Sequence, residues 1–205
     1  MKTKGCVFEQ HRYWGPPGAV GPPVVTTPDD SRFGNHGANT AITYEQQPSG
    51  LFASVFNGAT SRINCGAGAS LNLTSDLSII LWLWVASLGV TADFLVHRFA
   101  PGGGNEGYTF ALSDTVAGAI RFYSNNGGWD NSTGLITAGL WNFAAVTLSN
   151  ITGTFYINDK PAETFVTGRP ASNPGDNLDI GNQNGGGLGS LANLHSFQST
   201  TTPSP

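Results

Sequence analysis

Residues 78–87, SIILWLWVAS, carry the pattern that decides the fold class of this sequence. Side chains alternate between the two faces of a β-strand, which places Ile80, Trp82 and Trp84 on one face. The opposite face carries the alternating aliphatic residues Ile79, Leu81, Leu83 and Val85. A strand in a two-layer sandwich needs only one apolar face, so the second apolar face predicts a cover or a docking partner.

Three covers fit the face that carries Trp82 and Trp84. Loops of the same chain are the first choice for Trp82, and the N-terminal segment and a neighbouring chain are the alternatives. Apolar residues of the N-terminal segment and of the strand itself are therefore the candidates for an interface. These candidates are Trp14, Val24, Val25, Ile80 and Trp84.

The composition favours an all-β protein. Only 11% of the 205 residues are charged, and the chain contains 28 Gly and 12 Pro. Typical domains are about one quarter charged, so long helices with charged faces do not fit this sequence. Short alternating runs such as LFASVFNG, ADFLVHRF and WNFAAVTLS follow one another between Gly- and Asn-rich turns. This pattern predicts a two-sheet antiparallel jelly-roll sandwich, with a hairpin tip at Asn158 and Asp159.

The chain divides into three parts by composition. Residues 1–28 include WGPPGAVGPPVVTTP, whose prolines exclude a helix and predict an extended N-terminal arm. Residues 29–198 form the predicted sandwich as a single domain, and residues 199–205 form a polar tail.

Charge and hydropathy exclude several classes of partner. The net charge of −4 comes from scattered residues, and without a basic cluster we expect no nucleic-acid binding. The longest apolar run is too short for a bilayer, which needs about 20 residues, and no membrane partner is expected. The first 15 residues lack the apolar core of a signal peptide. We therefore expect Cys6 and Cys65 to be free thiols, with one disulfide as the alternative.

Motifs that carry chemistry are largely missing. No strand has the closely spaced carboxylates of a glycosidase, and no nucleophile elbow or zinc spacing occurs, so we predict a non-catalytic protein without cofactor or metal. Asp29, Asp30 and Asn35 offer oxygen ligands of the kind that calcium prefers. A turn in which these side chains bind nearby backbone N–H groups is the favoured interpretation.

The segment NNGGWDN, residues 125–131, is the candidate for binding sugar. Trp129 offers an aromatic platform, and neighbouring polar side chains suit sugar hydroxyl groups. The candidate residues are Asn126, Trp129, Asp130 and Asn131. The alternative, which we favour from the sequence, is a hairpin loop whose Trp129 folds back on the rim of its own sandwich.

Five motifs in order along the chain resemble those of laminin-G-like jelly-roll domains, which share the concanavalin A-like sandwich. They are DDSRFGNHG, SVFNGATSRINCG, SLNLTSDLSIILWLW, LITAGLWNFAAVTLSNITGTFYINDKPAET and NLDIGNQNGGGLGSLANLHSF. The resemblance covers about residues 29–197. Ala192 and Asn193 replace an acidic pair of the family pattern, and Asn142 and Phe143 replace its histidines. These departures remove polar features and count against a family calcium site.

These observations predict an interaction module. The first hypothesis is a structural component of a virion, such as a phage capsid decoration, cement or tail protein, made in the host cytoplasm. Its partners would be other protein subunits, including a major capsid protein or copies of itself. The alternative hypothesis is an extracellular carbohydrate-binding module with glycans as partners.

Overall fold

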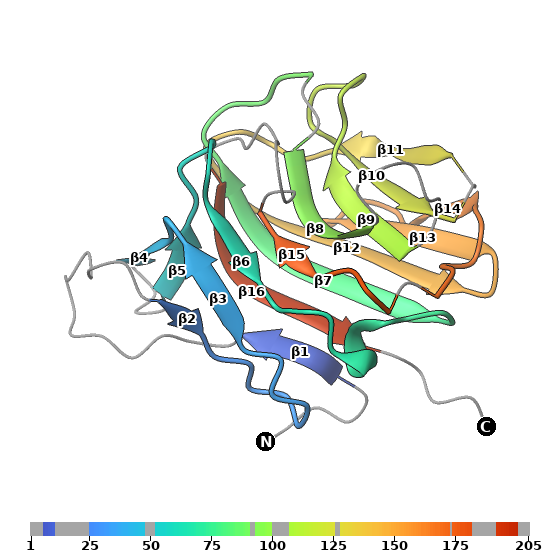
Figure 1. The fold of residues 1–205 in the computed structure, drawn as a ribbon. Helices are drawn as coiled ribbons and strands as arrows, with labels where there is room; N and C mark the ends of the chain where they lie inside the picture. Colours follow the sequence, from blue (N-terminus) through green and yellow to red (C-terminus); the bar gives the residue numbers. More distant parts are fainter. Residues whose placement is uncertain are drawn as a thin grey trace.

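The computed structural model describes residues 6–10, 25–47, 52–90, 93–99, 107–125, 128–172, 174–181 and 192–200. Two eight-stranded antiparallel sheets pack face to face, with the core between them (Figure 1). The predicted antiparallel jelly-roll sandwich is confirmed. None of the helices in these residues has the length and hydropathy to span a membrane.

Sheet A contains the strand whose two faces are both apolar, β7 (Leu77–Val85). In spatial order its strands are β14 (Glu163–Val166), β13 (Thr152–Ile157), β12 (Trp141–Ser149), β7 (Leu77–Val85), β16 (Ala192–Thr200), β5 (Phe52–Val55) and β4 (Thr43–Gln46). A further strand, β1 (Cys6–Gln10), pairs with β16. Sheet A therefore combines strands from both ends of the chain.

Sheet B forms the second layer. In spatial order its strands are β11 (Trp129–Leu135), β10 (Ala119–Ser124), β9 (Gly107–Leu112), β8 (Asp93–Phe99), β15 (Asp179–Ile180), β6 (Arg62–Asn64), β3 (Gly37–Thr40) and β2 (Thr26–Thr27). A short 3-10 helix, η1 (Ala69–Leu71), precedes β7 and buries Leu71.

Strand β7 alternates as its sequence predicts. Its odd-numbered residues from Leu77 to Val85 are buried in the core between the sheets. Ile80 and Trp84 are half-buried on the outer face, and Trp82 is 46% exposed there. The expectation that loops of the same chain cover Trp82 is therefore wrong.

The predicted N-terminal arm contributes to both sheets. Residues 6–10 form β1 on sheet A, and residues 26–27 form β2 on sheet B. Residues 11–24, which include two interface candidates, and residues 201–205 of the tail lie outside the described residues.

Two turns agree with the sequence. Asn158 has a φ of +50° at the tip of the β13–β14 hairpin, although Asp159 does not take a positive φ. The Asp29 carboxylate accepts hydrogen bonds from Ser31 N and Ser31 Oγ at 2.8 and 2.7 Å and from Asn35 N at 2.7 Å. The turn interpretation is confirmed for Asp29, whereas Asn35 Nδ2 donates to Ser70 Oγ at 2.9 Å. Within the described ranges no group of three or more His, Cys, Asp or Glu residues is placed to hold a metal.

Candidate functional site

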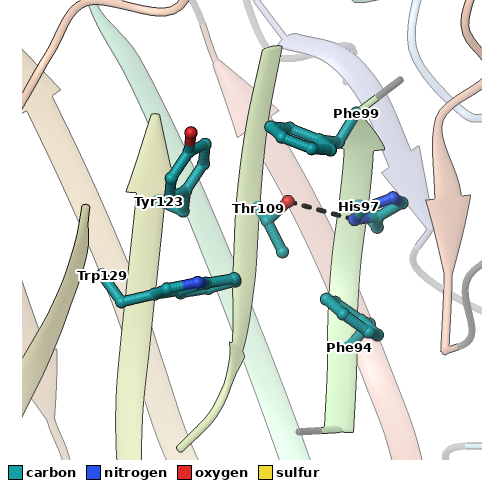
Figure 2. A pocket seen from close by; sticks show the side chains of 6 residues that line it. All are labelled: Phe94, His97, Phe99, Thr109, Tyr123 and Trp129. Carbon is teal, nitrogen blue, oxygen red and sulfur yellow. Dashed lines mark hydrogen bonds between the residues drawn. The ribbon is translucent and has the colours of Figure 1, made fainter. Parts of the chain in front are cut away.

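An aromatic pocket of about 280 Å³ opens on the outer face of sheet B. It is lined by Phe94, His97 and Phe99 of β8, Thr109 of β9, Tyr123 of β10 and Trp129 of β11. Figure 2 shows the small Thr109 side chain in the middle, with larger rings around it. The hollow exists because a threonine stands between strands that carry aromatic side chains.

A β-bulge places the three β8 side chains on one face. Phe94 lies opposite Ala111, and the register then shifts so that Val96 lies opposite Phe110. Leu95 and Val96 are consecutive, yet both are buried in the core. The extra residue of a bulge restarts the alternation, so Phe94, His97 and Phe99 all point outward (Figure 2).

The aromatic side chains form a continuous row around the pocket. The ring centroids of Phe94 and His97 are 4.9 Å apart, and those of His97 and Phe99 are 6.0 Å apart. Phe99 contacts Tyr123 edge to face at 5.2 Å, and Tyr123 contacts Trp129 at 5.3 Å. Such spacings are favourable for aromatic pairs and hold the rings in place.

His97 is the buried polar group of the pocket, with only 5% of its surface exposed. Its Nδ1 lies 3.0 Å from Thr109 Oγ1, and its Nε2 has no hydrogen-bond partner within the described part of the chain. Burial lowers the pKa of His97 to about 4, although the charge of Asp176 raises it slightly. The imidazole is therefore neutral at ordinary pH.

Arg121 supports the pocket without lining it. Its guanidinium Cζ lies 3.8 Å from the centroid of the Trp129 ring, which is a cation–π contact. The same guanidinium forms a salt bridge with Asp114, and Arg121 is almost fully buried. The contact holds the indole plane in place, and the positive charge of Arg121 is already paired with the Trp129 ring and with Asp114.

The predicted sugar-binding residues separate in the structure. Trp129 is 39% exposed and lines the pocket, but it begins strand β11 instead of lying in a loop. Trp129 belongs to the strand because it pairs with Tyr123 of β10, so that β11 begins directly after Gly128. The Trp129 ring packs on its own sheet against Tyr123 and Arg121, as the favoured interpretation expected, and it also lines the pocket.

The other three candidates do not line the pocket. Asp130 lies opposite the buried Phe122, which places its carboxylate on the inner side of the sheet, where burial raises its pKa. Asn131 is exposed on the outer face next to Arg121. Asn126 lies outside the described residues.

The interface candidates are also divided. Ile80 and Trp84 lie on the outer face of sheet A, where Trp82 contacts Phe143 edge to face with ring centroids 5.6 Å apart. Val25 is 79% exposed and lies beside the other sheet, where its carbonyl accepts a hydrogen bond from Asn39 N of β3. Trp14 and Val24 fall outside the described residues.

Comparison with known proteins identifies the family. The laminin-G-type model of the concanavalin A-like lectin/glucanases superfamily matches residues 57–204. The chain belongs to this family. The match includes three of the five motifs in full, most of the motif SVFNGATSRINCG and all strands that build the pocket. No curated protein matches the chain in sequence.

Solved structures with the same fold come from larger proteins. The binding domain of paraclostridial mosquitocidal protein 1 shares 17% identity at a TM-score of 0.67, over 98% of this chain and 50% of that one. The binding domain of botulinum neurotoxin DC in complex with SialylT shares 12% identity at a TM-score of 0.62, over 98% of this chain and 49% of that one. Trypanosoma rangeli sialidase in complex with sialic acid shares 11% identity at a TM-score of 0.65, over 97% of this chain and 31% of that one. The chain thus spans half or less of these proteins, and the likeness shows the fold.

Proposed function

We propose that this protein is a carbohydrate-binding module and that the pocket on sheet B is its binding site. The observation that carries the proposal is the enclosure of a small hollow by Phe94, Phe99, Tyr123 and Trp129. The apolar C–H face of a sugar ring packs on aromatic faces, whose quadrupole is negative. The hydroxyl groups of the sugar then have Thr109 and His97 as polar neighbours.

Three further observations support a glycan ligand. Ligand sites are mostly apolar concavities with a few placed polar groups, and this pocket has that composition. The family includes lectins, and two of the structures that share the fold are complexes with SialylT and with sialic acid. None of the matches described above is a virion component, so the virion hypothesis gains no support from them.

We also propose that the protein binds its ligand without cleaving it. Glycoside hydrolysis generally uses two carboxyl groups on either side of the scissile bond. The described residues that line the pocket include no Asp or Glu. Incubation with bound glycans should release no reducing sugar, and steady release that depends on Trp129 would contradict this part of the proposal.

A glycan array with purified protein tests the binding function. Trp129→Ala should weaken every specific signal at least tenfold, which corresponds to about 1.4 kcal/mol. Trp82→Ala is the matched control, because it removes the same side chain from an exposed position on the opposite sheet. Binding that survives Trp129→Ala, or that is lost equally in Trp82→Ala, would contradict the assignment of the site.

The outer face of sheet A supports a second candidate function, docking on another protein subunit. Trp82 remains largely exposed there beside Phe143, Ile80 and Trp84, and exposed apolar patches commonly mark interaction sites. Native mass measurement of the purified protein should show an oligomer that Trp82→Ala dissociates. A monomer at all accessible concentrations would remove self-association as the form of this docking.

A further inference from the structure

We infer that the pocket on sheet B selects an uncharged sugar unit and discriminates against both sialylated glycans and cationic ligands. The inference rests on the proposed carbohydrate-binding function and specifies the class of sugar.

A carboxylate on the ligand has no cationic partner in the described lining, which includes no Lys or Arg. Arg121 contacts the lining, but its guanidinium already pairs with Asp114 and lies against the Trp129 ring. Arg98, between the lining residues His97 and Phe99 in β8, is fully buried. Binding an anion without a partner costs desolvation that no cation of the described lining offsets.

A cationic ligand is disfavoured for the opposite reason. Aromatic enclosures often bind ammonium groups through cation–π contacts. Here one face of the Trp129 ring already holds the guanidinium of Arg121 at 3.8 Å, which weakens the attraction of that ring for a second cation. The described lining has no carboxylate that would attract a cationic ligand.

The polar side chains Thr109 and His97 of the described lining are neutral. Thr109 Oγ1 and His97 Nδ1 bind each other at 3.0 Å, and burial keeps the imidazole unprotonated at neutral pH. Hydroxyl groups can donate to and accept from such groups without a change in charge. These contacts suit sugar hydroxyls.

The size of the pocket fits one sugar unit. Its volume of about 280 Å³ is just below the range of about 300 to 1,000 Å³ that holds drug-sized ligands. A terminal unit can enter while the remainder of the glycan stays outside. Discrimination therefore acts on the charge of the terminal unit.

Titration calorimetry on matched pairs tests the inference. Each pair consists of a neutral oligosaccharide that the array identifies and the same oligosaccharide capped with sialic acid, and tetramethylammonium serves as the cationic probe. We expect the sialylated form to bind at least tenfold more weakly than the neutral form. Affinity for the neutral form should be nearly unchanged between low and high salt, because no ion pair is made.

The outcomes separate the two proposals. Equal or tighter binding of sialylated forms that Trp129→Ala abolishes would overturn the selectivity and leave the carbohydrate function standing. Absence of binding to any glycan would overturn the function and the inference with it. Binding of tetramethylammonium that is tighter than that of every sugar, and sensitive to Trp129→Ala, would also overturn both.

A charge variant provides an independent test. Asp114→Asn leaves the lining intact and removes the partner of Arg121. It should raise the affinity for the sialylated form by a few fold and leave that for the neutral form unchanged. Asp159→Asn at the exposed hairpin tip changes the net charge equally and is the control. Identical effects of the two variants would contradict the role assigned to Arg121.

Discussion

His97 shows how a single residue links the pocket to stability. Its ring is buried between Phe94 and Phe99, and its pKa falls from 6.5 to about 4 because burial penalises the charged form. The unfolded chain therefore binds a proton between these pH values that the folded protein does not bind. The free energy of unfolding therefore rises with pH between about 4 and 6.5, and the stabilisation that comes from His97 is lost as the pH falls through this window.

We expect His97→Gln to remove this pH dependence. In the native protein His97 should contribute at most about 3 kcal/mol of change in the free energy of unfolding between pH 4 and 6.5. Urea unfolding at several pH values in this window measures the difference between the two proteins. Curves that run parallel for the native protein and the variant would show that His97 is not the titrating group.

Asn142 shows what residue types alone do not reveal. The sequence suggests that replacing a family histidine with Asn142 loses a polar feature. Instead the buried Asn142 donates from Nδ2 to the carbonyl oxygens of Thr137 and Leu140 at 2.9 and 2.8 Å. Its Oδ1 accepts from Thr137 N and Asn158 Nδ2 at 3.0 and 3.1 Å. The partners come from turns whose geometry the sequence does not specify, so this role could not be predicted.

At the scale of the element, β7 and β8 mark the limits of sequence reasoning. Strict alternation in β7 predicts its two faces correctly. The same rule applied to ADFLVHRF in β8 separates Phe94 from His97, whereas the bulge at Leu95 and Val96 brings them together. The signal was the uninterrupted apolar run before His97, which a strand with one polar face does not need. Its interpretation requires the register with β9, which only the fold supplies.

Gly107 begins β9 directly opposite Phe99 of the pocket. Its φ is +90°, and a Cβ at this position would lie 2.0 Å from the carbonyl oxygen of Arg98. We expect Gly107→Ala to destabilise the protein by at least about 2 kcal/mol, since strain and a backbone clash combine. Gly128→Ala is the control, because Gly128 also has a positive φ but open space around its Cα.

Urea unfolding of the two glycine variants measures this effect. Gly128→Ala should cost only about 1 kcal/mol, the strain of a left-handed position without a clash. Equal costs for the two variants would show that the close approach of Gly107 to β8 does not matter for stability.

At the scale of the whole molecule, the two sheets form opposite layers of one sandwich (Figure 1). The two aromatic surfaces lie on different sheets. The core separates the pocket near Trp129 from the exposed face near Trp82, so substitutions at the two sites should be independent. The order of motifs along the chain predicts the sandwich because each motif encodes local strands. The pocket could be predicted only at Trp129, because its lining comes from four strands that the fold aligns.

The core itself protects a thiol. Cys65 is buried and free, and its pKa is raised well above the ordinary value by burial, with further contributions from the charges of Asp179 and Asp29. In a Cys6→Ser variant, Cys65 is the only cysteine. We expect this thiol to resist alkylation in the folded protein and to react fully in denaturant. Rapid, complete alkylation under native conditions would contradict the packing described for this part of the core.

The central claim is that the hollow over Thr109 holds the sugar. Thr109 is small and only 1% exposed, and the larger side chain in Thr109→Leu should extend into the hollow that Thr109 lines. Titration calorimetry with the best neutral glycan should give no binding for Thr109→Leu and weaker but measurable binding for Thr109→Val, which keeps the volume of the side chain and removes only its hydroxyl group. Undiminished binding by a folded Thr109→Leu protein would contradict the account.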